Sequence, residues 1–278
     1  MTDPILALKG VKRRYRTGGG FFSKETITTA VDDVSLTVAP GEVCAIVGES
    51  GSGKSTLARI AAGFDVPDGG EALFRGAPFA KPGSAAWRKE RALVQFVFQN
   101  PSGALDPRAS IASQIGEMLT THERCDAATR AARIEDILDR VGLAGMGRRV
   151  PQQMSGGQLQ RAVLARALVV RPELLICDEA VSALDVSVQA QILNLLMSLK
   201  DEFGLTMIFI THDLGVARHV GDRIAVMQKG RIVENRRTRY LFDTPRDAYT
   251  RTLLAAIPAA TPAARRAREA SLAPETAA

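Results

Sequence analysis

One short motif constrains the fold of this chain more than any other feature. Residues 48–55 read GESGSGKS and fit the phosphate-binding pattern G-x-x-x-x-G-K-[ST]. The run before the motif, 43–47, is short, apolar and partly β-branched, which is typical of a buried strand. The run after it, 56–62, favours a helix that stops at Gly63. A strand, a glycine-rich loop and a helix in this order predict an α/β fold that holds a nucleoside triphosphate.

The residue types of this loop explain how it would bind phosphate. Glycines permit backbone angles that other residues avoid, so successive N–H groups can turn toward the phosphates, and the start of the helix adds a positive dipole. Lys54 would place its ammonium on the β and γ phosphates, and the Ser55 hydroxyl would ligate Mg²⁺. The residues expected to contact the nucleotide here are Gly48, Glu49, Ser50, Gly51, Ser52, Gly53, Lys54, Ser55 and Thr56.

Length and cysteine content bound the class of protein. A chain of 278 residues suits one large α/β domain with an insertion, or two small lobes. No apolar run is long enough to cross a bilayer and the N-terminus lacks a signal-peptide pattern, which predicts a cytosolic chain. Cys44, Cys125 and Cys177 form no C-x-x-C pair, so we expect neither disulfides nor a cysteine metal site.

The net charge of +6 is only a weak indication of a nucleic acid or membrane partner. Much of the excess lies in residues 12–16 near the start and 265–268 near the end. The sequence has no stripe of basic residues interleaved with aromatic ones, the pattern typical of single-strand binding. We therefore expect solvated surface charge and no nucleic-acid partner.

The hydrophobic pattern divides the chain into three kinds of segment. Residues 1–40 read as short strands at 5–8 and 34–38, and the second alternates apolar and polar residues as a half-exposed antiparallel strand does. Between about 110 and 145 apolar residues recur at three- and four-residue spacings, which predicts a helical insertion. Strands alternating with helices around this insertion indicate a largely parallel sheet. The elements expected there are strands at 93–98, 174–177, 207–210 and 224–227 and helices at 159–169 and 187–203.

Two acidic residues, Asp178 and Glu179, follow the apolar run at 174–177. Because α/β sheets place their ligands at the C-terminal ends of strands, both are expected near the nucleotide. Asp178 fits a carboxylate that supports Mg²⁺, and Glu179 could polarise the attacking water. A solvated strand end is the alternative for an Asp-Glu pair, but a chance pair would not follow a phosphate loop in the same chain.

A second anion-binding pattern, SGGQ, lies at 155–158, where the helix at 159–169 is expected to begin. Its backbone N–H groups and its serine hydroxyl could form a cradle for an anion. Because one loop already serves the triphosphate, a second cradle beyond a helical insertion makes sense if it covers a nucleotide held by another subunit. The residues expected to contact that nucleotide are Ser155, Gly156, Gly157 and Gln158.

With this run, which reads MSGGQ at 154–158, the chain resembles the ATP-binding cassette (ABC) family, whose signature is L-S-G-G-Q. Methionine keeps the volume and apolarity of leucine. The resemblance implies a P-loop NTPase cassette with a mainly parallel core sheet, an antiparallel β subdomain and an α-helical insertion. It also implies an ATPase domain over 1–240, with a helical subdomain at about 100–165, and a C-terminal extension over 241–278. The last 20 or so residues have little to bury and are expected to be disordered.

The resemblance also assigns catalytic roles. Gln99 is similar to a glutamine that contacts Mg²⁺ and the water and signals to a membrane subunit, and His212 is similar to a switch histidine near the γ-phosphate. The implied catalytic residues are Glu179, His212 and Gln99, and the implied metal-binding residues are Ser55, Gln99 and Asp178.

Two further nucleotide contacts are implied. Asp185 ends the run at 182–185, which is similar to a loop that carries contacts across a dimer. Tyr15 is the candidate for stacking on adenine, and Phe21 or Phe22 could substitute because stacking needs only a well-placed aromatic ring.

Three runs are similar to the branch of this family that takes up dipeptides, oligopeptides and nickel: 99–108, 181–189 and 249–258. The chain departs from that branch at 247–248, where Asp-Ala replaces the usual His-Pro, and at 235–236, where Asn-Arg replaces the common x-Gly. We therefore expect the C-terminal lobe to pack differently. The chain has no cysteine in its last 100 residues, which excludes the iron-sulfur centre that some members carry there.

The resemblance implies a subunit on the cytoplasmic face of the membrane that binds and hydrolyses ATP with Mg²⁺ to power an ABC importer. Its implied partners are a second ABC ATPase, either a paralogue or a second copy, two membrane permeases and, indirectly, an extracytoplasmic solute-binding protein. Di- or oligopeptides are the first expectation for the solute. The alternatives are nickel or another small solute, or a soluble ABC ATPase in a phosphonate-breakdown type of assembly.

Overall fold

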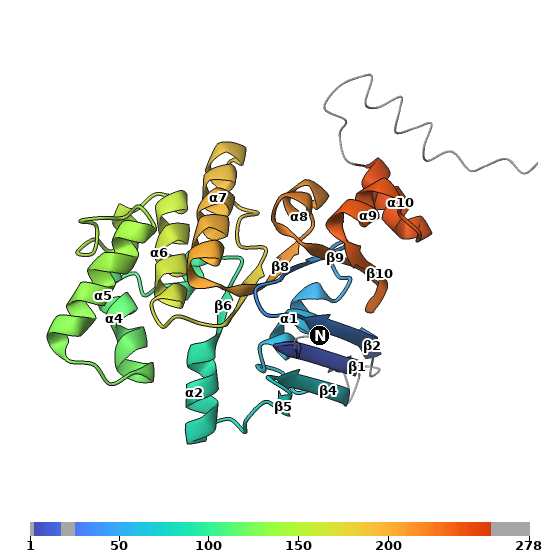
Figure 1. Cartoon of the computed structure of the whole chain (residues 1–278), viewed down its shortest axis with the longest axis horizontal. Coiled ribbons are helices and arrows are strands. Elements are labelled where there is room, and N and C mark those ends of the chain that lie inside the picture. The colour runs from blue at the N-terminus through green and yellow to red at the C-terminus, as the bar shows by residue number, and fades with distance from the viewer. Residues whose placement is uncertain (1–2, 18–25, 257–278) are drawn as a thin grey trace, which may run out of the picture.

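The protein is built around a central sheet that is mainly parallel, as the sequence predicts (Figure 1). The computed structural model describes residues 3–17 and 26–256. Within them the strand order of this sheet is β10-β9-β3-β8-β7-β6, and only the β9/β10 pair is antiparallel. The strands are β3 (Val43–Val47), β6 (Val94–Val97), β7 (Leu174–Asp178), β8 (Thr206–Thr211), β9 (Arg223–Gln228) and β10 (Arg231–Arg237).

A smaller antiparallel sheet, with the order β2-β1-β4-β5, confirms the expected β subdomain. Its strands are β1 (Leu6–Thr17), β2 (Thr26–Val38), β4 (Gly69–Phe74) and β5 (Ala77–Pro78). The strands predicted at 5–8 and 34–38 are correct but too short. The buried apolar positions of β1 end at Val11, whereas backbone pairing with β2 continues to Thr17, so the hydrophobic pattern marks only part of the ladder.

The helical insertion lies to one side of the central sheet, on the left of Figure 1. Its main helices cover a buried cluster that includes Leu175, Cys177, Met207 and Phe209 from one face of the sheet. The helices in this half are α2 (Ala85–Leu93), α3 (Pro101–Ala104), α4 (Ile111–His122), α5 (Ala127–Arg140), α6 (Gly156–Leu168) and α7 (Val186–Phe203), with a short 3₁₀ turn at Pro151–Gln153.

Successive strand residues point to opposite faces of the sheet, so the residues that alternate with those of the first cluster are buried on the other face. Ile46, Ile176 and Ile208 pack there with α1 (Lys54–Ala61) and with the apolar side of the small sheet. Because α1 lies between the two sheets, the loop that precedes it is held by both of them.

The C-terminal elements extend the same core. Leu241 and Leu254 pack with Val47 and Val226 in a third buried cluster. They belong to α9 (Thr238–Asp243) and α10 (Ala248–Ala255), which lie beside α8 (Leu214–Val220). The division expected at residue 240 therefore falls inside a helix that shares the core of the cassette. The segment expected to be disordered lies outside the described residues.

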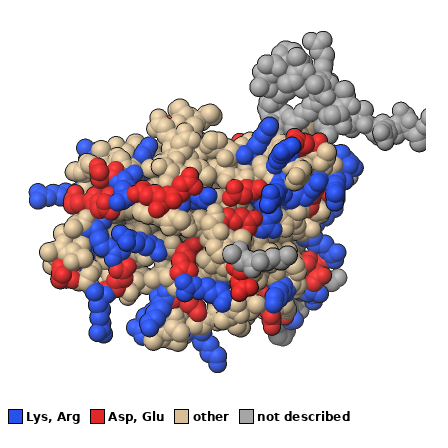
Figure 2. Space-filling view, in the orientation of Figure 1, with Lys and Arg blue, Asp and Glu red and all other residues tan. Residues whose placement is uncertain are grey.

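Figure 2 shows basic and acidic side chains mixed over this face of the molecule. In the part of the chain that the structure describes, no helix has the length and hydropathy needed to span a membrane.

Candidate nucleotide site

The loop after β3 has the shape that a phosphate-binding loop requires. At Gly48 a Cβ atom would overlap the backbone carbonyl of Met227, and at Gly53 it would overlap that of Ala30. Gly53 also has φ of +102°, which favours glycine. Glycine at these two positions lets the loop pack directly against backbone from both sheets.

The loop is braced by its own polar groups and by the turn between β9 and β10. Ser52 N–H donates to the Glu49 carbonyl at 3.2 Å, and the Ser52 carbonyl accepts the Gly230 N–H at 2.9 Å. Lys54 Nζ donates to the carbonyls of Gly48 and Glu49, both at 2.8 Å. Burial lowers the pKa of Lys54, while the nearby carboxylates act in the opposite direction.

The C-terminal end of β7 brings Asp178 to this loop. Ser55, at the start of α1, donates its hydroxyl to Asp178 Oδ1 at 3.2 Å. Burial raises the pKa of Asp178, whereas the hydrogen bond from Ser55 acts to lower it. A hydroxyl and a carboxylate are the hard oxygen ligands that Mg²⁺ prefers, and Mg²⁺ is commonly held by one or two protein ligands together with substrate phosphates. The described residues contain no cluster of three or more acidic, histidine or cysteine side chains able to hold a metal ion.

Glu179 is the meeting point of three strand ends. Gln99 Nε2 donates to Glu179 Oε2 at 3.0 Å, and His212 Nδ1 lies 3.5 Å from the same oxygen. Glu179, Gln99 and His212 follow β7, β6 and β8, which are neighbours in the sheet. Glu179 itself has φ of +48°, and its N–H donates to the Ile210 carbonyl at 3.0 Å. A carboxylate held between an amide and an imidazole is suited to orient a water and accept its proton.

The SGGQ run begins α6, as predicted, and it does so through a capping box. Ser155 Oγ accepts the Gln158 N–H at 3.4 Å, and Gln158 Oε1 accepts the Ser155 N–H at 3.1 Å. The Ser155 hydroxyl therefore caps the helix and retains its own proton for a further partner. Asp185, just before α7, lines the same groove. The groove is lined by Ser155, Gly156, Gly157, Gln158, Arg161, Ala183, Leu184, Asp185, Val188 and Gln191.

Comparison with known proteins identifies this arrangement. The family model described as ABC transporter matches residues 31–182. The chain belongs to the ABC transporter family. It is 41% identical, over 95% of its length and 81% of the relative, to the dipeptide transport ATP-binding protein DppF of Haemophilus influenzae. It is 44% identical, over 91% of its length and 80% of the relative, to the oligopeptide transport ATP-binding protein OppF of Lactococcus lactis.

A solved structure confirms the fold of this ABC ATPase. It is the ATP-binding cassette whose dimer was captured in a post-hydrolysis state bound to ADP and Pi, with a TM-score of 0.74 and 30% identity over 84% of this chain and 99% of that one. The α/β cassette expected from the sequence is therefore correct.

The expected adenine contact at Tyr15 stays a prediction. The ring of Tyr15 lies under the guanidinium of Arg13, 5.1 Å from it, and its hydroxyl donates to Asp65 at 3.5 Å. Phe21 and Phe22, the alternatives, lie outside the described residues.

One residue that contacts the loop was not predicted from the sequence. Tyr249, in α10, accepts the backbone N–H of Glu49 with its hydroxyl at 3.1 Å. The two residues are 200 positions apart, and the only sequence signal was the place of Tyr249 at the start of the branch-like run at 249–258.

Proposed function

We propose that this ABC ATPase binds and hydrolyses MgATP to power the import of di- or oligopeptides. The observation that carries the proposal is the position of the Glu179 carboxylate, held by Gln99 and His212 beside the phosphate loop. In this proposal Glu179 accepts a proton from the attacking water, and Gln99 and His212 fix the orientation of its carboxylate.

The phosphate loop and the C-terminal end of β7 are proposed to bind different parts of MgATP. Lys54 and the loop N–H groups would hold the phosphates, and Ser55 and Asp178 would hold Mg²⁺. Gln99, which donates to the neighbouring Glu179, is proposed as a further contact of the metal. A Mg²⁺ ion held there would supply positive charge to neutralise the phosphates. Thr56 and the remaining loop residues, Ser50 and Gly51, are proposed to contact the same phosphates.

The second half of the site is proposed to come from another ATPase subunit. The groove at the start of α6 offers backbone N–H groups at the N-terminus of a 13-residue helix, a suitable partner for phosphate oxygens. Asp185 beside it would contact the partner across the interface. The solved dimer of a related cassette supports this arrangement.

The solute and the membrane partners are proposed from the relatives. DppF and OppF are named as dipeptide and oligopeptide transport ATP-binding proteins, and the chain covers four fifths of each. We accordingly propose that this chain works on the cytoplasmic face of the membrane with a second ATPase, two permeases and an extracytoplasmic peptide-binding protein.

Reconstitution would test this function. The tagged full chain is purified from membranes of its own cells, together with whatever it binds, and placed in vesicles that contain ATP. We expect two polytopic membrane proteins in the preparation and uptake of a labelled dipeptide that requires hydrolysable ATP. Uptake of Ni²⁺ without peptide uptake, or recovery of the chain with soluble proteins alone, would contradict the proposal.

A further inference from the structure

The phosphate loop receives one brace from the far end of the chain. The Glu49 carbonyl accepts hydrogen bonds from Ser52 and Lys54, which belong to the loop itself. The Glu49 N–H instead donates to the hydroxyl of Tyr249 at 3.1 Å. The first peptide group inside the loop is therefore fixed by a side chain of α10.

The ring of Tyr249 is anchored beneath this contact. It packs against the cluster in which Leu254 and Leu241 meet Val47, the residue that precedes the loop. Burial raises the pKa of the Tyr249 hydroxyl, so it remains a neutral group at neutral pH. A ring held among apolar side chains fixes where its hydroxyl lies relative to the loop.

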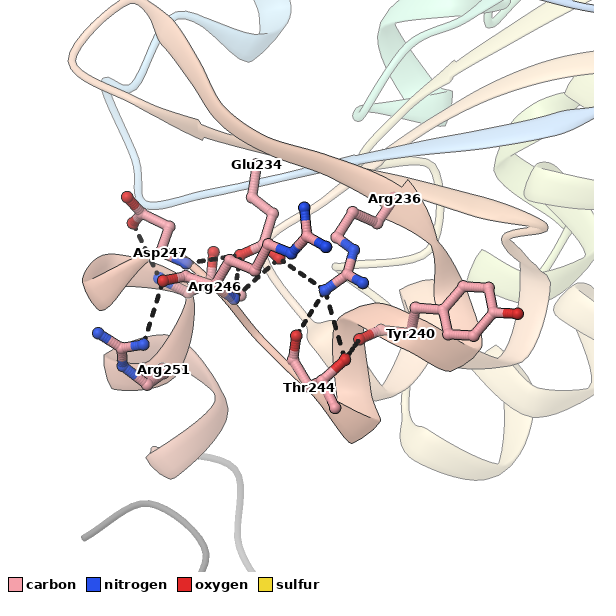
Figure 3. Close-up of polar contacts among 8 residues, drawn as sticks. Glu234, Arg236, Tyr240, Thr244, Arg246, Asp247 and Arg251 are labelled. Atoms are coloured by element: carbon pink, nitrogen blue, oxygen red, sulfur yellow. Dashed lines mark hydrogen bonds and ion pairs between the residues drawn. The ribbon is translucent and has the colours of Figure 1, made fainter. Parts of the chain in front are cut away.

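The helix that carries Tyr249 is itself held at its N-terminus. Asp247 caps α10 by accepting the Tyr249 N–H at 2.8 Å. The buried Glu234 of β10 accepts the N–H groups of Asp247, at 3.0 Å, and of Arg246, at 3.1 Å (Figure 3). Figure 3 also shows Arg236 between Glu234 and the end of α9; it lies 3.6 Å from the Glu234 carboxylate and donates to the Thr244 carbonyl. The start of α10 is thus tied to the central sheet by a buried carboxylate.

We infer that Tyr249 is a positioning residue for the phosphate loop, through which the C-terminal extension raises the affinity of the loop for nucleotide. Tyr249 contacts the first residue after Gly48, whereas Lys54 and Ser55, which would meet the phosphates, lie at the other end of the loop. Its hydroxyl acts by holding the loop in its folded shape before the nucleotide arrives, which lowers the entropy lost on binding. The inference rests on the proposed binding of ATP at this loop.

The experiment compares Tyr249→Phe with wild type in the full chain. The substitution keeps the ring in its cluster and removes the hydroxyl that accepts the Glu49 N–H. We expect the Kd and KM for MgATP to rise roughly two- to tenfold, the range that one hydrogen bond covers, with kcat at saturating MgATP unchanged. If the Tyr249 hydroxyl only stabilised the fold, its loss would lower the midpoint of urea unfolding but would not raise KM at unchanged kcat.

Tyr240→Phe is the matched control. Tyr240 lies on α9 of the same extension and is 49% exposed, so the same loss of a hydroxyl should leave both constants unchanged. A second variant, Glu234→Gln, weakens the anchor of α10 and keeps the Tyr249 hydroxyl. We expect its KM for MgATP to rise in the same direction.

The outcomes separate this inference from the proposed function. If wild type binds MgATP and Tyr249→Phe binds it equally well, the inference is wrong and the proposed function stands. If wild type binds no MgATP, the proposed function fails. Should Tyr249→Phe not fold, an unchanged KM in folded Glu234→Gln would overturn the inference on its own.

Discussion

At the scale of single residues, the site places two neighbouring carboxylates in different environments. Asp178 hydrogen bonds to Ser55 at the phosphate loop, and burial raises its pKa. Glu179, one residue later, turns away from the strand with φ of +48° and meets Gln99 and His212. A non-glycine residue in this region costs roughly 1–3 kcal/mol, and such strain persists where the surrounding structure fixes the residue firmly. The turn lets one strand place two neighbouring carboxylates in different surroundings, as the proposed roles of Asp178 toward Mg²⁺ and of Glu179 toward water require.

The change Glu179→Gln separates binding from hydrolysis. Glutamine keeps the size of the side chain but cannot accept the proton from water, so we expect the rate of phosphate release to fall by about 10²- to 10⁴-fold. Equilibrium binding of MgATP should be retained, because Lys54 and the loop are unchanged. Glu117→Gln, a substitution at an exposed position of α4, is the control and should leave both quantities at the wild-type level. Phosphate release by Glu179→Gln near the wild-type rate would show that another group accepts the proton.

At the scale of elements, the sequence predicts best where a pattern is local. The loop at 48–55, the strand that ends at Asp178 and the helix at 187–203 are all present within one or two residues of their expected bounds. Gln99, Glu179 and His212 lie together because they follow adjacent parallel strands. The order of these strands was not predicted from the sequence, and only the family resemblance assigned Gln99 and His212 to this site.

The elements and contacts that sequence reasoning misses depend on pairing and packing between distant segments. β1 extends six residues beyond Val11, because backbone pairing with β2 needs no apolar side chain. The contact from Tyr249 to Glu49 joins α10 to a loop 200 positions earlier, and the hydrophobic pattern of neither segment predicts it.

The junction of β10 and α10 gives an element-scale prediction. Burial opposes ionisation of Glu234, but the backbone N–H groups of Asp247 and Arg246 hold its pKa below the ordinary 4.5. The carboxylate therefore stabilises the fold at a pH above the unfolded-state pKa, and this contribution is lost as the pH falls through the lower folded-state pKa. We expect Glu234→Gln to lower the free energy of unfolding by about 1–2 kcal/mol at pH 7, since hydrogen bonds to a charged acceptor are the stronger kind.

Urea unfolding at pH 7 and at pH 3 measures this effect. The gap between wild type and Glu234→Gln should narrow at pH 3, because Glu234 of the unfolded chain gains a proton below its ordinary pKa of 4.5 and the contribution of the lowered folded-state pKa diminishes. Asp243→Asn is the control, because Asp243 pairs with Arg239 on the exposed side of α9 and its loss should cost little at either pH. A gap of equal size at both pH values would show that the charge of Glu234 does not hold α10.

At the scale of the whole molecule, the two surfaces proposed to contact nucleotide belong to different parts of the fold. The phosphate loop lies between the two sheets, whereas the groove at the start of α6 lies in the helical half (Figure 1). Each surface offers backbone N–H groups at a helix start, and each is suited to the same phosphates. In the proposed arrangement the groove of one subunit faces the phosphate loop of another.

The change Ser155→Arg, made in Glu179→Gln, tests this arrangement. A large cation in the groove would obstruct its contact with the partner's nucleotide, while the phosphate loop of the same chain stays intact. We expect Glu179→Gln to close with itself or with a co-expressed partner ATPase in MgATP, as measured by light scattering on a sizing column. The double variant should bind MgATP with unchanged Kd and fail to close.

Ser110→Arg in Glu179→Gln is the matched control for this experiment. Ser110 caps α4 as Ser155 caps α6, accepting the Ser113 N–H at 3.3 Å, so both substitutions remove one helix cap at a cost of about 1 kcal/mol. Only Ser155 lines the groove that is proposed to cover the nucleotide. If both double variants closed equally well, the groove would have no part in the interface, and the second half of the site would have to come from another surface. If both failed, the loss of a cap would explain the result. The comparison would then use Gly156→Val, which adds a side chain to the groove without removing a cap, because a Cβ at Gly156 meets only Leu184, at 3.6 Å.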